Sequence, residues 1–263
     1  MLRKLLKYDL KWVYKIVVVF YILAIIFSAI GRGLNAIENS LIFSVLAQIS
    51  FGIAISMMVS SLINCLMRLW ARFIKNLYKD ESYLTHTLPV KKKTIYASKI
   101  ISAFISIFTT VVVILICLFI CYYSETNMQF VKSLLEFAAE TYNTTVLKLL
   151  LLFSFTFFLE IMFTVLVGYV GIIIGHKSNQ NKMIKTIVLG LVMYMLTQIV
   201  TLGLIYVLGL FNSDVMNLIN TNDMVSIDTI KFIMYSGISM YVIYIIFYYF
   251  WGKKQLEKGV NVD

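Results

Sequence analysis

Side chains able to do chemistry are few in this sequence, and they do not fall at the spacings that catalytic or metal sites require. The two histidines, His86 and His176, have no cysteine or carboxylate at metal-ligand spacing. Intramembrane proteolysis would need facing aspartates, a serine and histidine pair or H-E-x-x-H inside the apolar runs, and none is present. We therefore expect no catalytic residue, no metal and no cofactor.

The sequence also lacks a nucleotide-binding motif. It contains no G-x-x-x-x-G-K-[ST] phosphate loop, and no G-x-G-x-x-G precedes a helix. The segments between the apolar runs are too short to form a nucleotide-binding domain. We expect a non-enzyme whose energy, if it performs transport, comes from a partner or from an ion gradient.

Polar and basic side chains gather between Arg68 and Lys99. Within this loop, Asp80 can cap a short helix whose first turn carries Glu81. The only proline of the chain, Pro89, would end this helix, because proline has no amide hydrogen and disfavours helix at the preceding residue. The sequence predicts a helix of about two turns inside a loop.

Three apolar side chains would project from this short helix: Tyr83, Leu84 and Leu88. A tyrosine has an apolar ring and a polar tip, so it suits an interface that is dry at one end and wet at the other. These side chains can therefore anchor the loop in the groove of a soluble partner. The alternative is that they pack back onto the membrane surface and bind nothing.

The rest of the chain is apolar enough to define its class. Hydrophobic residues make up 60% of it and its mean hydropathy is +0.88, well above the values of soluble domains. Crossing the hydrocarbon core takes about 20 helical residues. The apolar runs lack the strict alternation of barrel strands. We predict an all-α, polytopic membrane protein with a single transmembrane domain over 1–263, and six spans at about 14–30, 41–67, 100–122, 146–174, 186–211 and 230–251.

Lysine and arginine are distributed unequally among the segments that connect these spans. The N-terminal segment, the loop of 68–99, the segment after the fourth span and the C-terminal tail carry 19 of the 23 cations. The other four are Arg32, Lys132, Lys148 and Lys231. By the positive-inside rule, both termini and the loop of 68–99 are cytoplasmic. This topology and anionic lipid headgroups account for the +10 net charge, so no nucleic-acid partner is expected.

The first twelve residues, MLRKLLKYDLKW, are too short and too charged to span a bilayer. One broad helical face can hold the apolar side chains, with basic residues around the other face. The apolar side chains are Leu2, Leu5, Leu6, Tyr8 and Trp12. The segment 1–12 is therefore expected to form an amphipathic helix in the membrane interface. The first span should then end in a turn at 31–33, which reads Gly-Arg-Gly.

The loop also resembles a known family. Residues 80–90 read DESYLTHTLPV, and three lysines and then Ser98 and Lys99 follow before the third span. This segment resembles the first cytoplasmic loop of ABC-2 type transporter permeases, with the pattern DE-x-YL-x-x-x-LPV, a basic run and SK. Elsewhere the likeness is one of topology. The residues that the resemblance places at the ATPase-coupling site are Asp80, Glu81, Tyr83, Leu84, Leu88 and Pro89.

The resemblance implies a multi-pass permease in a bacterial plasma membrane. Such a subunit pairs with a second permease, either a copy of itself or a close relative, and is driven by two copies of a separate ATP-binding subunit. The outer loops are short, which favours export over uptake. The spans are rich in aromatic residues and methionine, which suits a hydrophobic or amphipathic cargo. The favoured cargo is a peptide, such as a toxin or an antimicrobial peptide. The alternatives are an exporter of lipids or drugs and a non-transporting scaffold or sensor subunit.

Two features inside the spans also qualify as candidate sites. Glu160 is the carboxylate that lies well within a span, where an ionisable group costs about 2.5 kcal/mol or more unless it is paired or wetted. It can line a pathway, accept a proton or hydrogen-bond to a tyrosine or serine of a neighbouring helix. The inner half of the fourth span is crowded with Gly168, Gly171 and Gly175. Gly171 and Gly175 have the four-residue spacing that allows close helix contact, either within one subunit or between two.

Overall fold

The computed structural model describes residues 1–37, 40–123, 125–178, 180–212, 214–216 and 227–259, and its regular elements there are helices. Six of these helices are long and apolar enough to cross a membrane, which confirms the predicted all-α, polytopic fold. The helices are α1 (Leu2–Asn35), α2 (Leu41–Leu77), α3 (Ser82–Thr87), α4 (Lys92–Tyr122), α5 (Glu125–Thr141), α6 (Val146–Gly175), α7 (Lys182–Phe211) and α9 (Ile227–Glu257).

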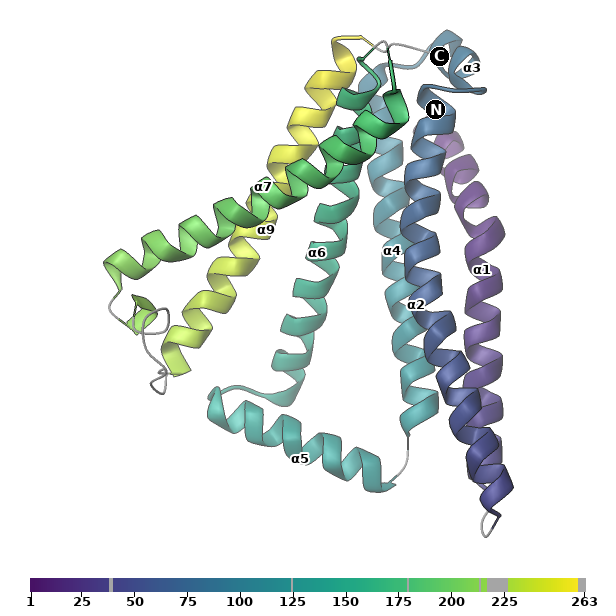
Figure 1. Cartoon of the computed structure of the whole chain (residues 1–263), viewed down its shortest axis with the longest axis vertical. Helices are drawn as coiled ribbons and strands as arrows, with labels where there is room; N and C mark the ends of the chain where they lie inside the picture. Colours follow the sequence, from purple (N-terminus) through teal and green to yellow (C-terminus); the bar gives the residue numbers. More distant parts are fainter. Residues whose placement is uncertain (38–39, 124, 179, 213, 217–226, 260–263) are drawn as a thin grey trace. The chain divides into compact units, whose positions relative to one another are not determined.

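The chain forms two compact units, 1–132 and 133–263, whose boundary falls within α5. The first unit is built from α1, α2 and α4, which pack side by side along their lengths (Figure 1). Small buried residues such as Ala24 and Ala54 let the helices approach. Hydroxyl pairs join α1 to α4, with Tyr21 Oη and Thr110 Oγ1 2.7 Å apart. The single permease domain over 1–263 stays a prediction.

The N-terminal segment is not a separate interfacial helix. Residues 2–35 form one continuous helix, so the first twelve residues extend the first span. Asp9 and Val13 of this segment are buried against the protein, and Tyr8 of the predicted apolar face is exposed. The physical reason is that Asp9 pairs with cations of α2 and α4, which holds the segment against the other helices.

The predicted turn at 31–33 is likewise replaced by helix. Gly31 is buried, and a Cβ atom at this position would lie 2.6 Å from the ring of Phe51 in α2. Glycine here permits a close helix contact, and this contact offsets the cost of about 1 kcal/mol that glycine carries inside a helix.

The second unit is organised around α6, which packs against both α7 and α9. Its central buried side chain is Phe163, whose ring contacts four tyrosine rings of α7 and α9 at centroid distances of 5.8 to 5.9 Å. Two of these pairs are edge-to-face and two are tilted, and favourable aromatic pairs each add about 0.5–1.5 kcal/mol beyond the area they bury. The tyrosines are Tyr194, Tyr241, Tyr244 and Tyr248.

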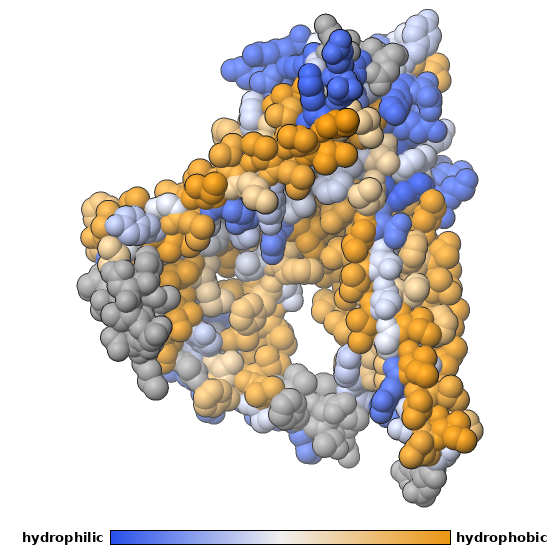
Figure 2. All heavy atoms as spheres, in the orientation of Figure 1, coloured by the Kyte–Doolittle hydropathy of each residue, from blue (hydrophilic) through white to orange (hydrophobic). Residues whose placement is uncertain are grey.

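The outward faces of the spanning helices are apolar. Figure 2 shows orange side chains along the flanks of the long helices and hydrophilic side chains gathered toward the top of the view. Ile22 of α1 and Ile199 of α7 are examples of large side chains that face outward. In water such faces would drive aggregation, whereas lipid tails solvate them. The chain is a multi-pass membrane protein.

The segment between α4 and α6, which the sequence indicated only as an outer loop, contains α5. This helix has 17 residues, is less apolar than the spans and is not one of the six. Leu134 and Phe137 on α5 are exposed.

Candidate functional site

The predicted short helix is present as α3. The loop that holds it is shorter than the predicted 68–99, because α2 continues to Leu77 and α4 begins at Lys92. The start of α3 also differs from the prediction. The residue that precedes its first turn is Glu81, and Asp80 makes no cap. Asp80 instead lies 3.9 Å from Lys75 Nζ with 79% of its side chain exposed. The end of the helix agrees with the prediction, because Leu88 is already extended before Pro89.

α3 divides its side chains sharply between solvent and protein. Tyr83 is 77% exposed and Leu84 66%, and Leu88 is also exposed. Ser82 and Thr85 are buried on the opposite face. The helix therefore presents two large apolar side chains to its surroundings while the other face is held by the first unit.

Polar contacts with the last turns of α2 hold the buried face of α3. Asn76 Nδ2 donates to Thr85 Oγ1 at 2.9 Å, and Nε2 of His86 lies 3.1 Å from the carbonyl oxygen of Leu77. A helix of six residues is too short to be stable by itself. These tertiary contacts explain why it forms at all.

A buried charge cluster then ties α3 to the spanning helices. We use the name charge cluster for Asp9 of α1, Arg72 of α2, Glu81 at the start of α3 and Lys99 of α4. Arg72 bridges two carboxylates, with its Nε 2.9 Å from Asp9 Oδ1 and its Nη1 2.5 Å from Glu81 Oε2. Lys99 Nζ lies 2.6 Å from Asp9 Oδ1. The cluster thus links four helices at one end of the first unit.

Three members of the charge cluster are buried, the Glu81 side chain is 33% exposed, and the two cations balance the two carboxylates. Asp9 is 3% exposed and Lys99 2%, and Arg72 is also buried. Ser98 Oγ completes the surroundings of Asp9 by donating to Oδ2 at 3.1 Å. Removing one partner from such a buried network typically costs about 3–5 kcal/mol, because the remaining charge is left without compensation. The network therefore specifies one arrangement of these four helices.

Arg68 adds a second contact between α1 and α2 at the same end of the unit. Its guanidinium lies 3.7 Å from the centre of the Trp12 ring, and its Nη2 donates to the Trp12 carbonyl oxygen at 2.8 Å. A cation over an indole face is a favourable electrostatic contact. Both Trp12 and Asp9, in the segment predicted to lie in the interface, therefore anchor α1 to α2.

Asp9, Arg72 and Lys99 are not among the site residues predicted from the sequence. Lys99 entered that prediction only as part of the SK that follows the basic run and through the distribution of cations, and Arg72 only through that distribution. One signal was available: Asp9 is the only carboxylate among the first 37 residues, within a strongly basic segment. An isolated acid next to a membrane span requires a partner. Which cations serve as partners depends on helix packing that periodicity does not encode.

The other candidate residues lie in the second unit. Glu160 is half-buried, and within the described part of the chain its carboxylate takes no hydrogen bond or ion pair. Its backbone carbonyl accepts a hydrogen bond from Thr164 Oγ1 at 2.9 Å. Neither Glu160 nor the glycines of α6 share a unit with α3.

Two of the three glycines pack against α7. A Cβ atom on Gly171 would lie 2.9 Å from the Cα of Gly190, and one on Gly175 would lie 2.6 Å from the Cα of Thr186. Gly168 is half-buried. The close approach at Gly171 and Gly175 is a contact within one chain.

Comparison of this chain with protein-family models, with curated proteins and with solved structures found no match. What the protein does is therefore inferred from its residues and their geometry.

Proposed function

We propose that this chain is the permease subunit of an ATP-driven exporter of the ABC-2 type, and that α3 docks on a separate ATP-binding subunit. The observation that carries the proposal is a contrast in α3 between exposed side chains and a helix that is held firmly in place. Tyr83 and Leu84 are exposed, yet the helix that presents them is fastened to the first unit by the charge cluster.

This arrangement suits a lever better than a passive loop. A partner that grips Tyr83 and Leu84 applies force to α3, and Glu81 passes this force to Arg72. Arg72 is bound in turn to Asp9, and Asp9 to Lys99. Movement of α3 would therefore be transmitted to α1, α2 and α4 together. A loop that only connected two spans would not need a network of four charged groups, three of them buried.

The remaining parts of the proposal follow from the sequence. The chain contains no phosphate-binding loop, so hydrolysis belongs to the partner, in two copies. A second permease subunit, either identical or closely related, would complete the pathway. The distribution of cations favours cytoplasmic termini in a bacterial plasma membrane. The cargo that fits such apolar spans is a hydrophobic or amphipathic molecule, with a peptide favoured.

The experiment is purification of the tagged full chain from its native membrane, with identification of any co-purified subunit that carries a phosphate-loop sequence. Tyr83→Ala combined with Leu84→Ala should weaken the complex at least about 30-fold, because one buried interface anchor alone contributes about 2 kcal/mol or more. In proteoliposomes, the same variant should export less cargo per ATP hydrolysed.

A matched control is available in the same unit. Tyr8 and Leu2 are also an exposed tyrosine and leucine, but they lie on α1. Tyr8→Ala with Leu2→Ala should leave the complex intact. Wild-type stability and undiminished export per ATP in the Tyr83→Ala and Leu84→Ala variant would refute the lever. Absence of any ATP-binding subunit would favour the scaffold or sensor alternative.

A further inference from the structure

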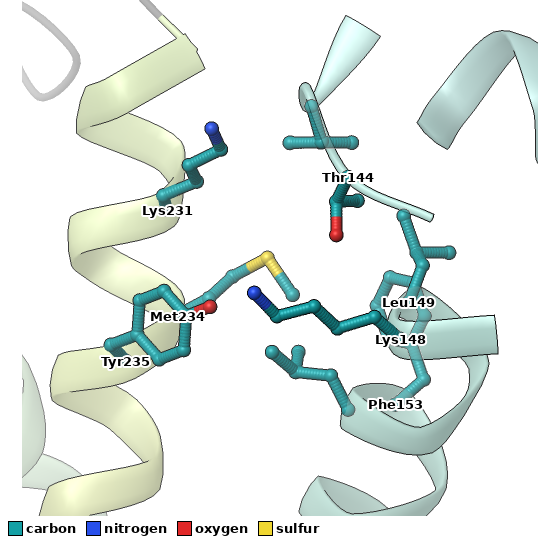
Figure 3. A pocket seen from close by; sticks show the side chains of 9 residues that line it. Thr144, Lys148, Leu149, Phe153, Lys231, Met234 and Tyr235 are labelled. Atoms are coloured by element: carbon teal, nitrogen blue, oxygen red, sulfur yellow. The ribbon is translucent and has the colours of Figure 1, made fainter. Parts of the chain in front are cut away.

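A cleft between α6 and α9 brings together two lysines that are 83 positions apart in the sequence. It lies within the second unit and measures about 400 Å³, part of which is open to the surroundings. Lys148 and Lys231 line it together with apolar side chains and two tyrosines (Figure 3). The other lining residues are Tyr142, Thr144, Leu149, Leu152, Phe153, Met234 and Tyr235.

The cleft lies where α6 and α9 begin, and the opposite ends of these helices are joined. There Lys177 Nζ, just after α6, donates to Gln255 Oε1 of α9 at 2.6 Å. Lys148 is the third residue of α6 and Lys231 the fifth of α9. The cleft is therefore at the membrane boundary that is poor in cations, and it holds two of the four lysines and arginines assigned to that side.

Lys148, in the first turn of α6, occupies a helix position that disfavours positive charge, and Lys231 lies just beyond the first turn of α9. The N-terminus of a helix carries about half a positive elementary charge, so a cation in the first turns is repelled by the helix. Two helix N-termini and two ammonium groups thus make the cleft strongly positive. In Figure 3 the side chain of Lys148 extends across the gap toward Met234 and Tyr235 of α9, so its charge lies inside the cleft and not away from it.

The described residues supply little negative charge to balance this cleft. Asp228 Oδ1 lies 3.9 Å from Lys231 Nζ, but Asp228 is 95% exposed, so this pair is weak. No carboxylate lines the cleft. Below the ammonium groups the walls are apolar: Leu149 is buried, and Leu152, Phe153 and Met234 surround the same space.

We propose that this cleft binds an anionic phospholipid, with the phosphate between Lys148 and Lys231 and an acyl chain along Leu152 and Phe153. A phosphate group suits two ammonium donors, and the phenol of Tyr235 and the hydroxyl of Thr144 are within the same lining. The apolar wall explains why the occupant is a lipid and not a free anion. This site is independent of the exporter proposal, because it needs neither ATP nor a partner.

The test is native mass spectrometry of the purified full chain with added dioleoyl phosphatidylglycerol, dioleoyl phosphatidylcholine or inorganic phosphate. Preferential retention of the phosphatidylglycerol is expected, without competition from inorganic phosphate at the same concentration. Lys148→Gln with Lys231→Gln should weaken phosphatidylglycerol binding about 30-fold, since each lysine near an anionic lipid contributes about fivefold. Lys148→Arg with Lys231→Arg should keep the binding.

The matched control, Arg32→Gln with Lys132→Gln, removes the other two cations assigned to the same side. If Lys148 and Lys231 form a defined site, this control should change the affinity for phosphatidylglycerol less than about twofold. An equal loss in this control would overturn the site in favour of diffuse electrostatic attraction. Displacement of the lipid by inorganic phosphate would identify a free-anion site instead. Retention of the phosphatidylcholine as strong as that of the phosphatidylglycerol would also refute the proposal. Unchanged elution and helical content of each variant would show that the losses are not unfolding.

Discussion

The charge cluster makes a quantitative prediction through Asp9→Asn. Asparagine has nearly the shape of aspartate, so packing is preserved, but Arg72 and Lys99 lose the carboxylate that both contact. Glu81 would then be the one carboxylate left in the cluster. Of the two cations, its ion pair is with Arg72 and not with Lys99. With Lys99 2% exposed, water cannot replace the lost partner. A loss of about 3–5 kcal/mol is expected.

Three cysteines make this loss measurable in the first unit. Cys65, Cys117 and Cys121 are buried and free, and all lie between residues 1 and 132. A thiol-reactive fluorophore in detergent therefore reports unfolding of this unit. If about 1 kcal/mol lowers the melting temperature by about 3 °C, as in soluble domains of similar size, Asp9→Asn should melt roughly 10–15 °C below wild type.

Two further variants distinguish the buried network from a general effect of charge. Asp80→Asn makes the same chemical change in the same unit at an exposed site, and it should cost less than about 1 kcal/mol. Lys99→Met, added to Asp9→Asn, leaves Arg72 paired with Glu81 and should recover part of the stability. A melting temperature unchanged by Asp9→Asn, or losses that simply add in the double variant, would refute the reasoning.

Three other predictions concern packing, topology and transport. Gly175→Ala should destabilise the contact of α6 with α7 by about 1–3 kcal/mol, because its Cβ would overlap Thr186, while Gly203→Ala has open space; faster hydrogen exchange in α6 and α7 for the first variant alone checks this. Asp214→Cys should react with a membrane-impermeant maleimide added outside intact cells and Lys93→Cys should not; the reverse pattern would overturn the positive-inside topology. Glu160→Gln should keep the complex with the ATP-binding subunit and lower export in proteoliposomes, whereas unchanged export would show that this carboxylate is not in the pathway.

The number and type of the spans could be predicted because the signal is local. Any continuous run of about 20 apolar residues must satisfy its own backbone hydrogen bonds in lipid, and a helix does so without a partner. All six predicted spans fall within helices for this reason. The helices extend beyond the spans, as α2 does to Leu77, and this extension is set by contacts outside the apolar run.

Predictions of turns and helix starts that rested on single glycine or aspartate residues were less successful. Gly31 and Gly33 read as a turn, but helix continues through both, because Gly31 allows Phe51 to approach. Asp80 was the better capping residue by type, yet α3 begins after Glu81, whose carboxylate is bound by Arg72. In each case a tertiary contact outweighed a local preference of about 1 kcal/mol.

The amino-acid sequence by itself determined that the chain crosses the membrane in six helices and that Tyr83 and Leu84 stand on a short helix in a basic loop. Only the tertiary structure decided how that helix is held. Asp9 and Arg72 are 63 positions apart and Asp9 and Lys99 are 90 apart. The tertiary structure also decided that Lys148 and Lys231, which are far apart in the sequence, line one cleft. Apolar periodicity fixes which residues are helical, but it does not specify which helix faces meet, and charge pairing across those faces depends on that choice.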